Sequence, residues 1–254
     1  PLGVFQRCRT TTTARDQLVV LPHRYRLPPY NIPGNARFQL GGEAASSTSG
    51  QSGDFTSVRE YRPGDPLRHI HWKSWARTGK AIVKEYEDVF FPRYGLVLDT
   101  FAPAEEADMF EEAVSVAASF AASIDTRETL LDLMFIRDEA YVFSAGRGEE
   151  RIDSMLEVLA GVNCEPVQDF EALQKLVLRY RDDLTACICI FTGWCEQRRD
   201  TIVNLQRAGI DLKIFSICRD HEEVQALHEM HPSPVPVLWL RTDHVEEDLH
   251  RNIP

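Results

Sequence analysis

The sequence has no run of about eighteen apolar residues, so nothing in its 254 residues is expected to span a membrane. It also lacks a Gly-x-Ser-x-Gly nucleophile motif and a Walker-type phosphate loop. The cysteines show no paired metal-ligand spacing and have no histidine at an informative distance, and their pattern indicates a reducing compartment. They are Cys8, Cys164, Cys187, Cys189, Cys195 and Cys218. We therefore expect no catalytic residue and no cofactor, in a chain that is not an enzyme.

Positive charge is scarce except in one segment. The whole chain has a net charge of −11, which argues against general nucleic-acid binding. Between Arg59 and Lys84, however, seven Lys/Arg residues stand against Glu60 and Asp65, a net charge of +5, so the remainder carries −16. Gathering like charges has an electrostatic cost, which indicates an anionic partner or a structural cluster of carboxylates.

The basic segment also carries many fixed residue types at fixed spacing. They are Arg59-Glu60-Tyr61-Arg62-Pro63-Gly64-Asp65, Arg68, Ile70, Trp72-Lys73, Ala76-Arg77-Thr78-Gly79-Lys80 and Val83-Lys84-Glu85. This pattern closely resembles the hallmark of the domain of unknown function 58 family, although Trp75 stands where the family has a small or polar residue. Upstream, Pro1–Phe5 and Val19–Pro22 look like the strands that precede the hallmark in that family. Downstream, Tyr94 to about Arg219 looks like its von Willebrand factor A-type domain.

The resemblance implies a setting and a partner. Family members carry two hydrophobic helices upstream, and the chain begins at Pro1 rather than methionine. We therefore expect a soluble piece of a longer protein that is anchored at the cytoplasmic face of a membrane. The implied partner is a MoxR-type AAA+ ATPase, a chaperone-like remodelling motor. The residues expected to bind it are Arg59, Glu60, Tyr61, Arg62, Gly64, Asp65, Arg68, Trp72, Lys73, Arg77 and Lys80.

Four regions follow from composition and pattern. Residues 1–40 are expected to be a strand and loop remnant of an upstream β region, and residues 41–57 a flexible Gly/Ser-rich loop. Residues 58–93 form the signature segment, and residues 94–245 the von Willebrand factor A-type domain.

Strand and helix patterns alternate after Tyr94. Predicted strands are 95–99, 130–136, 140–144, 186–191, 212–218 and 235–240, with 130–136 and 140–144 paired as a hairpin. Predicted helices are 108–124, 152–162, 170–180 and 196–208, the last ended by Gly209. This rhythm predicts an α/β, Rossmann-like fold with a mostly parallel sheet covered by helices on both faces and joined by right-handed crossovers.

A degenerate metal motif is expected at the end of the first strand of this domain. A-type domains place a divalent cation on Asp-x-Ser-x-Ser, but here the sequence reads Asp99-Thr100-Phe101-Ala102-Pro103, and Gly193 follows Thr192 where a second carboxylate would stand. Asp99 with Thr100 or Thr192 would hold at most a weakly bound ion. The favoured alternative is that Asp99 caps the following loop or pairs with a signature arginine.

Within the signature segment, Pro63-Gly64-Asp65 has the chemistry of a turn. Glu60, Asp65 and Glu85 are the expected partners of arginines that the turn gathers: Arg59, Arg62, Arg68 and Arg77. On a strand, His69 and His71 would share one face, as surface residues or, less favoured, as a metal pair.

Three functions are compatible with these features. The first is a non-enzymatic adaptor that binds a protein partner. The second is a binding domain for an anionic ligand or polymer, in which Trp72 and Trp75 with Arg68 and Arg77 stack on bases or sugars instead of packing structurally. The third is a weak divalent-cation-dependent ligand-binding domain at Asp99.

Overall fold

The computed structural model describes residues 19–27, 53–88, 92–103, 106–124, 129–145, 149–165 and 169–253. The chain divides into two compact units, Asn35–Pro92 and the combination of Pro1–Gly34 with Arg93–Pro254. We call the first the signature unit and the second the α/β unit. The predicted strand at Pro1–Phe5 and residues 41–52 of the predicted loop lie outside the described residues, whereas residues 53–57 begin a strand.

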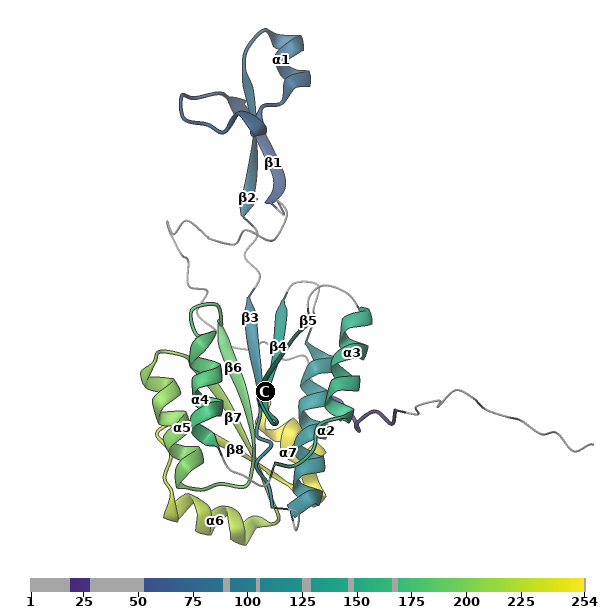
Figure 1. The fold of residues 1–254 in the computed structure, drawn as a ribbon, viewed down its shortest axis with the longest axis vertical. Helices are drawn as coiled ribbons and strands as arrows, with labels where there is room; N and C mark the ends of the chain where they lie inside the picture. Colours follow the sequence, from purple (N-terminus) through teal and green to yellow (C-terminus); the bar gives the residue numbers. More distant parts are fainter. Residues whose placement is uncertain are drawn as a thin grey trace, which may run out of the picture. The chain divides into compact units, whose positions relative to one another are not determined.

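The signature unit contains a two-stranded antiparallel sheet with short helices between its strands (Figure 1). Its elements are β1 (Gly53–Glu60), the 3₁₀ helix η1 (Leu67–His69), α1 (Trp72–Thr78) and β2 (Ile82–Asp88). Only strands and loops were predicted here, so α1 is a correction. Seven residues are too few for a repeating apolar stripe, and Trp, Ser and Thr are only moderate helix formers.

The α/β unit is built on a six-stranded sheet in the order β5-β4-β3-β6-β7-β8. The strands are β3 (Arg93–Leu98), β4 (Leu130–Ile136), β5 (Ala140–Ala145), β6 (Ala186–Thr192), β7 (Asp211–Cys218) and β8 (Val237–Arg241). All neighbours are parallel except β4 and β5, which form the predicted antiparallel hairpin. The prediction of an α/β fold with a mostly parallel sheet is confirmed.

Helices cover both faces of this sheet. They are α2 (Ala107–Ser123), α3 (Glu149–Ala160), α4 (Phe170–Arg179), α5 (Glu196–Arg207), α6 (His221–Met230) and α7 (Val245–Asn252), with a 3₁₀ turn η3 (Thr242–His244) before α7. Figure 1 shows α2, α3 and α7 on one side and α4, α5 and α6 on the other. Gly209 follows α5 with φ of 81°, which confirms it as the stop signal. The pattern predicted neither α6 nor α7, and α6 has no fully buried residue that would mark an apolar stripe.

Alternate residues of the central strands face the two helical layers. Leu96 and Leu98 of β3 lie in the core cluster that contains α2, whereas Val97 lies in the cluster that contains α4 and α5. Cys187 and Cys189 of β6 belong to the second cluster and are fully buried, as predicted for cysteines that act as small apolar residues. Because both faces are covered, the strands are continuous apolar runs rather than alternating ones.

Residues 19–27 have no regular secondary structure, so the predicted upstream strand at Val19–Pro22 is wrong. Val19 and Val20 are exposed. The segment is bonded to α2 further along, through Tyr25. Its N–H donates to Ser119 Oγ of α2 at 2.8 Å, and its hydroxyl donates to Glu112 at 2.6 Å. An apolar run with no neighbouring strand to bond to remains irregular. In the described part of the chain, every helix is too short or too polar to cross a membrane.

Candidate functional site

The turn after β1 is fixed by one carboxylate. Gly64 has φ of 109°, a conformation that favours glycine, and the Asp65 N–H donates to the Arg62 carbonyl at 3.0 Å. Asp65 in turn accepts from the Arg62 N–H at 2.8 Å. The Arg59 guanidinium donates to both Asp65 oxygens, at 2.7 and 2.8 Å. The predicted Pro-Gly-Asp turn is therefore confirmed, and a bidentate arginine holds it closed.

The other two predicted carboxylates are also paired. Glu85 of β2 accepts from Arg59 Nε at 2.8 Å, so Arg59 joins both strands to the turn. Glu60 accepts from Lys80 Nζ at 2.7 Å. Asp65 and Glu85 thus share a single arginine, and the third carboxylate binds a lysine. We expected several arginines to pair with these carboxylates, and this expectation is wrong. Arg59 is the one arginine that forms an ion pair with them among the described residues.

The Asp65 turn should respond to acid. Hydrogen bonds from Arg59 and from the Arg62 N–H lower the pKa of Asp65 from 3.8 to about 2. Because the folded pKa is depressed, the ionised carboxylate stabilises the turn fully above about pH 4, and this contribution is lost as pH falls through about 2. We expect the Asp65 carboxyl carbon, followed by NMR, to titrate near pH 2. In the Arg59→Gln variant the midpoint should rise toward 3.8, and a wild-type midpoint already at that value would contradict the role of Arg59.

Helix α1 is anchored on β2 by its preceding residues. Ile70 is buried and forms a bridge with the buried Val83 of β2. His71 is the residue before the helix, and its Nδ1 lies 2.6 Å from Ser74 Oγ. His69 belongs to η1, so the two histidines do not lie on one strand and the proposed shared face is wrong. The bridge at Ile70 fixes where α1 leaves the sheet, and therefore which of its side chains face outward.

The outward side of η1 and α1 combines apolar and cationic groups. Leu67 is 66% exposed and Trp72 is 62% exposed, and the Trp72 ring stacks on Trp75 with centroids 5.2 Å apart and an interplanar angle of 16°. Lys73 and Arg77 are four residues apart in α1 and so share a face next to Trp72. We call Leu67, Arg68, Trp72, Lys73 and Arg77 the α1 surface.

The predicted binding residues therefore separate into two groups. Those with internal structural roles are Arg59, Glu60, Tyr61, Gly64, Asp65 and Lys80, where the Tyr61 N–H donates to the Ala81 carbonyl at 2.9 Å. Those that face solvent and form no ion pair with a described side chain are Arg62, Arg68, Lys73 and Arg77, together with Trp72. Arg68 donates from Nε to His69 Nε2 at 3.2 Å, which leaves its other nitrogens available.

The end of β3 holds a buried ion pair where a metal motif would stand. Asp99 is fully buried, and one of its oxygens accepts from the Phe101 N–H at 2.9 Å. The other accepts from Arg198 Nε of α5 at 2.7 Å and from the Thr192 N–H at 3.3 Å. Burial raises the pKa of Asp99, while Arg198 and the two backbone amides oppose this rise. Asp99 thus caps the following loop as predicted, but its arginine is Arg198 rather than a signature arginine.

Arg198 is held beside Asp99 by two further contacts. Its Nη2 donates to the Phe101 carbonyl at 2.8 Å, and its guanidinium carbon lies 5.2 Å from the centre of the Phe170 ring. The Thr100 hydroxyl donates to the Ile136 carbonyl, and the buried Thr192 hydroxyl has no hydrogen-bond partner within the described residues. An ion bound at Asp99 would first have to displace this arginine.

A signal for Arg198 is present in the sequence. The buried positions of α5 are Arg198, Thr201, Ile202 and Leu205, at helical spacing. A cation on the buried stripe of a helix requires a buried carboxylate, because an unpaired charge is costly there. Within the described residues, no group of three or more His, Cys, Asp or Glu side chains is arranged to hold a metal ion.

The chain is similar to a protein family, to a curated bacterial protein and to solved structures. A family model described as "Protein of unknown function DUF58" matches residues 57–193. "Uncharacterized protein YeaD" of Bacillus subtilis (strain 168) is 32% identical in an alignment of 176 residues that covers 66% of this chain and 42% of that protein. The crystal structure of manganese-loaded Plasmodium vivax TRAP protein matches with a TM-score of 0.40 and 12% identity, covering 64% of this chain and 73% of that one.

Proposed function

Because the chain belongs to the DUF58 family of proteins of unknown function, we propose a role from the geometry of its signature unit. The chain is a non-enzymatic adaptor, and its α1 surface docks on an acidic surface of a partner protein. One observation carries this proposal. Arg59 and the exposed Lys80 are paired with carboxylates of the unit itself, whereas the exposed Arg68, Lys73 and Arg77 form no ion pair with a described side chain.

The apolar part of the α1 surface supports docking rather than stability. An exposed tryptophan and leucine gain nothing from burial in the free chain, yet Trp and Arg are the residues that contribute most to protein interfaces when covered. Cations around an apolar centre select an acidic partner and exclude a basic one. The signature unit therefore offers a compact recognition surface whose own shape is held by the Arg59–Asp65 turn.

By family resemblance, the partner in this proposal is a MoxR-type AAA+ ATPase, and the process is protein remodelling or assembly. In the longer protein, an upstream segment would hold the adaptor at the cytoplasmic face of the membrane. The chain spans 42% of the length of the curated relative that it matches, so these parts of the proposal concern a larger molecule.

Binding to such an ATPase from the same genome tests the proposal by calorimetry or co-elution. The charge-reversal variant Arg68→Glu with Arg77→Glu is expected to lose affinity by at least about tenfold, since each change places a carboxylate against the acidic partner. The matched control is Arg179→Glu with Arg207→Glu, because both arginines are exposed in the last turns of α4 and α5. Wild-type affinity in a correctly folded α1-surface variant, or an equal loss in the control, would contradict the docking role.

A second candidate follows from the stacked tryptophans. The exposed Trp72 ring stacks on the half-buried Trp75 in the segment that carries Arg68 and Arg77, and single-stranded nucleic acid also favours such an aromatic and cationic surface. Titration with oligothymidylate, followed by tryptophan fluorescence, separates the two candidates. An affinity that falls steeply between about 50 and 200 mM salt would support the anionic polymer. Absence of binding to the oligonucleotide at low salt, together with measurable binding to the ATPase, would support the adaptor.

A further inference from the structure

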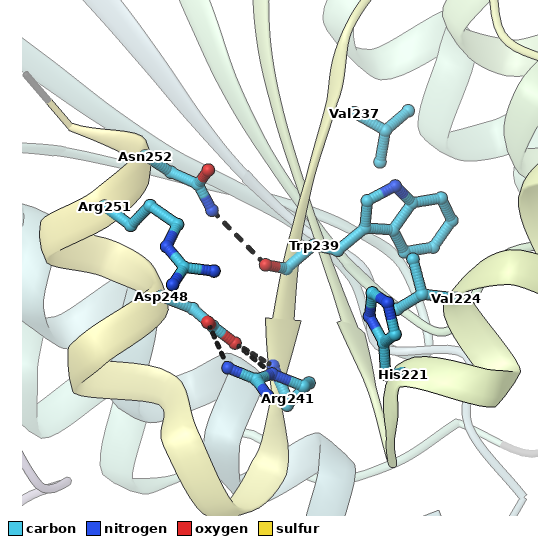
Figure 2. A pocket seen from close by; sticks show the side chains of 8 residues that line it. All are labelled: His221, Val224, Val237, Trp239, Arg241, Asp248, Arg251 and Asn252. Carbon is cyan, nitrogen blue, oxygen red and sulfur yellow. Dashed lines mark hydrogen bonds and ion pairs between the residues drawn. The ribbon is translucent and has the colours of Figure 1, made fainter.

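A cavity of about 470 Å³ lies in the α/β unit beside β8, the last strand of the sheet in the described part of the chain (Figure 2). Its lining comes from α6, β8 and α7, and consists of His221, Val224, Val237, Trp239, Arg241, Asp248, Arg251 and Asn252. The volume is within the range of roughly 300–1,000 Å³ that small-molecule sites occupy. The signature unit contributes no lining residue, so this site is separate from the proposed docking surface.

One wall of the cavity is apolar, and its tryptophan is fixed by packing against a neighbouring tryptophan. Val224, Val237 and Trp239 form it, and Figure 2 shows their side chains gathered on the α6 side. The Trp239 ring packs edge-on against Trp194, with centroids 6.0 Å apart and an interplanar angle of 77°. Trp194 is itself fixed by a 2.9 Å hydrogen bond from Nε1 to the His231 carbonyl. Trp239 therefore offers a supported aromatic surface to a ligand.

The opposite wall carries an excess of positive charge. Arg241 and Asp248 are bonded to each other through two side-chain hydrogen bonds of 2.9 and 2.7 Å. Asp248 is the single carboxylate among the lining residues, so it neutralises one of the two arginines there. Arg251 is exposed and forms no ion pair with a described side chain, and its charge acts on Asp248 only through the longer-range electrostatic interaction. His221 lines the cavity from α6. The remaining charge favours an anionic group.

The edge of β8 is closed to an added strand. Asn252 donates from Nδ2 to the Trp239 carbonyl at 3.3 Å, and Asp248 accepts from the Arg241 N–H at 3.0 Å. Both backbone groups would be needed by an extended peptide that pairs with this edge. Because α7 already occupies them, a small molecule fits the cavity better than a peptide strand does.

We propose that this cavity binds a small aromatic carboxylate. The ring of the ligand lies on Trp239 between Val224 and Val237, where stacking and burial stabilise it. Its carboxylate pairs with the Arg251 guanidinium, whose planar donors match the two oxygens of a carboxylate. The proposal goes beyond the docking role, since it involves a different unit and a different class of ligand.

The test uses 3-phenylpropionate as the probe and the neutral 3-phenylpropionamide as its control of equal shape. The indole N–H signal of Trp239, identified by its loss in Trp239→Phe, is followed by NMR in the labelled chain. We expect a saturable shift with the acid and at least tenfold weaker binding of the amide. Arg251→Gln should weaken binding of the acid by about tenfold or more. Arg207→Gln, a change at an exposed arginine of α5 outside the cavity, should leave it unchanged.

Three results would overturn the site. These are no saturable shift with 3-phenylpropionate, equal affinity for the acid and the amide, or unchanged affinity in a folded Arg251→Gln variant. The comparison of acid with amide uses the unaltered chain, so the proposal can be tested even where a substitution disturbs folding. Docking on an ATPase is measured independently through the α1 surface, and neither outcome decides the other.

Discussion

Arg198→Ala is expected to destabilise the α/β unit by about 3–5 kcal/mol, because it leaves the buried Asp99 carboxylate without its counter-charge. The substitution removes the 2.7 Å bond to Asp99 and the 2.8 Å bond to the Phe101 carbonyl in one step. Urea unfolding, monitored by circular dichroism, measures the loss as a lower midpoint.

The neighbouring Arg199 is the matched control. It lies on the same helix but forms surface pairs with Glu196 and Asp200, at 3.3 and 2.8 Å. Arg199→Ala should therefore cost no more than about 1 kcal/mol. Replacing both members of the buried pair, as Asp99→Asn with Arg198→Met, should recover part of the loss because no buried charge is then left unpaired. Equal midpoints for the Arg198→Ala and Arg199→Ala variants would show that the pair is not structural.

Phe101→Ala is expected to cost about 3–5 kcal/mol, since it empties a fully buried aromatic position. The Phe101 ring packs edge-on against Phe170 of α4, with centroids 4.9 Å apart. The backbone of Phe101 still bonds to Asp99 and Arg198 in the variant, so the loss measures the ring itself. Urea unfolding again provides the measurement.

Tyr141 on the edge strand β5 is a suitable control for this change. It is 39% exposed and packs against Phe135 with centroids 4.8 Å apart, so Tyr141→Ala should cost within about 1 kcal/mol. The double variant of Phe101 and Arg198 should lose less than the two single losses added together, because both side chains pack against the Phe170 ring. A strictly additive result would show that the residues at this strand end act independently.

Local sequence patterns were sufficient to predict most strands and helices of the α/β unit. Buried strands such as β6 consist of apolar, β-branched and small residues, and α2 repeats apolar residues at helical spacing, so neighbours in sequence predict these elements. Helix α6 escaped prediction because its residues are mostly exposed and supply little periodic signal. The von Willebrand factor A-type assignment stays a prediction that rests on family resemblance.

These local patterns could not predict ion pairs between residues that are far apart in the sequence. Asp99 and Arg198 are 99 positions apart, and no local rule chooses this arginine over those of the signature segment. Within that segment the sequence identified the paired carboxylates Glu60, Asp65 and Glu85 correctly, but it did not show which cation pairs with each of them. Arg59 serves two carboxylates because β1 and β2 bring Glu85 next to the turn that holds Asp65.

By itself, the sequence determined the α/β alternation, the Pro-Gly-Asp turn and the basic character of one segment, because these depend on residues that are close along the chain. Only the tertiary structure decided that Arg198 pairs with the buried Asp99, that Trp72 remains uncovered and that a cavity opens beside β8. Those outcomes depend on distances and burial between elements, which folding sets and local composition does not.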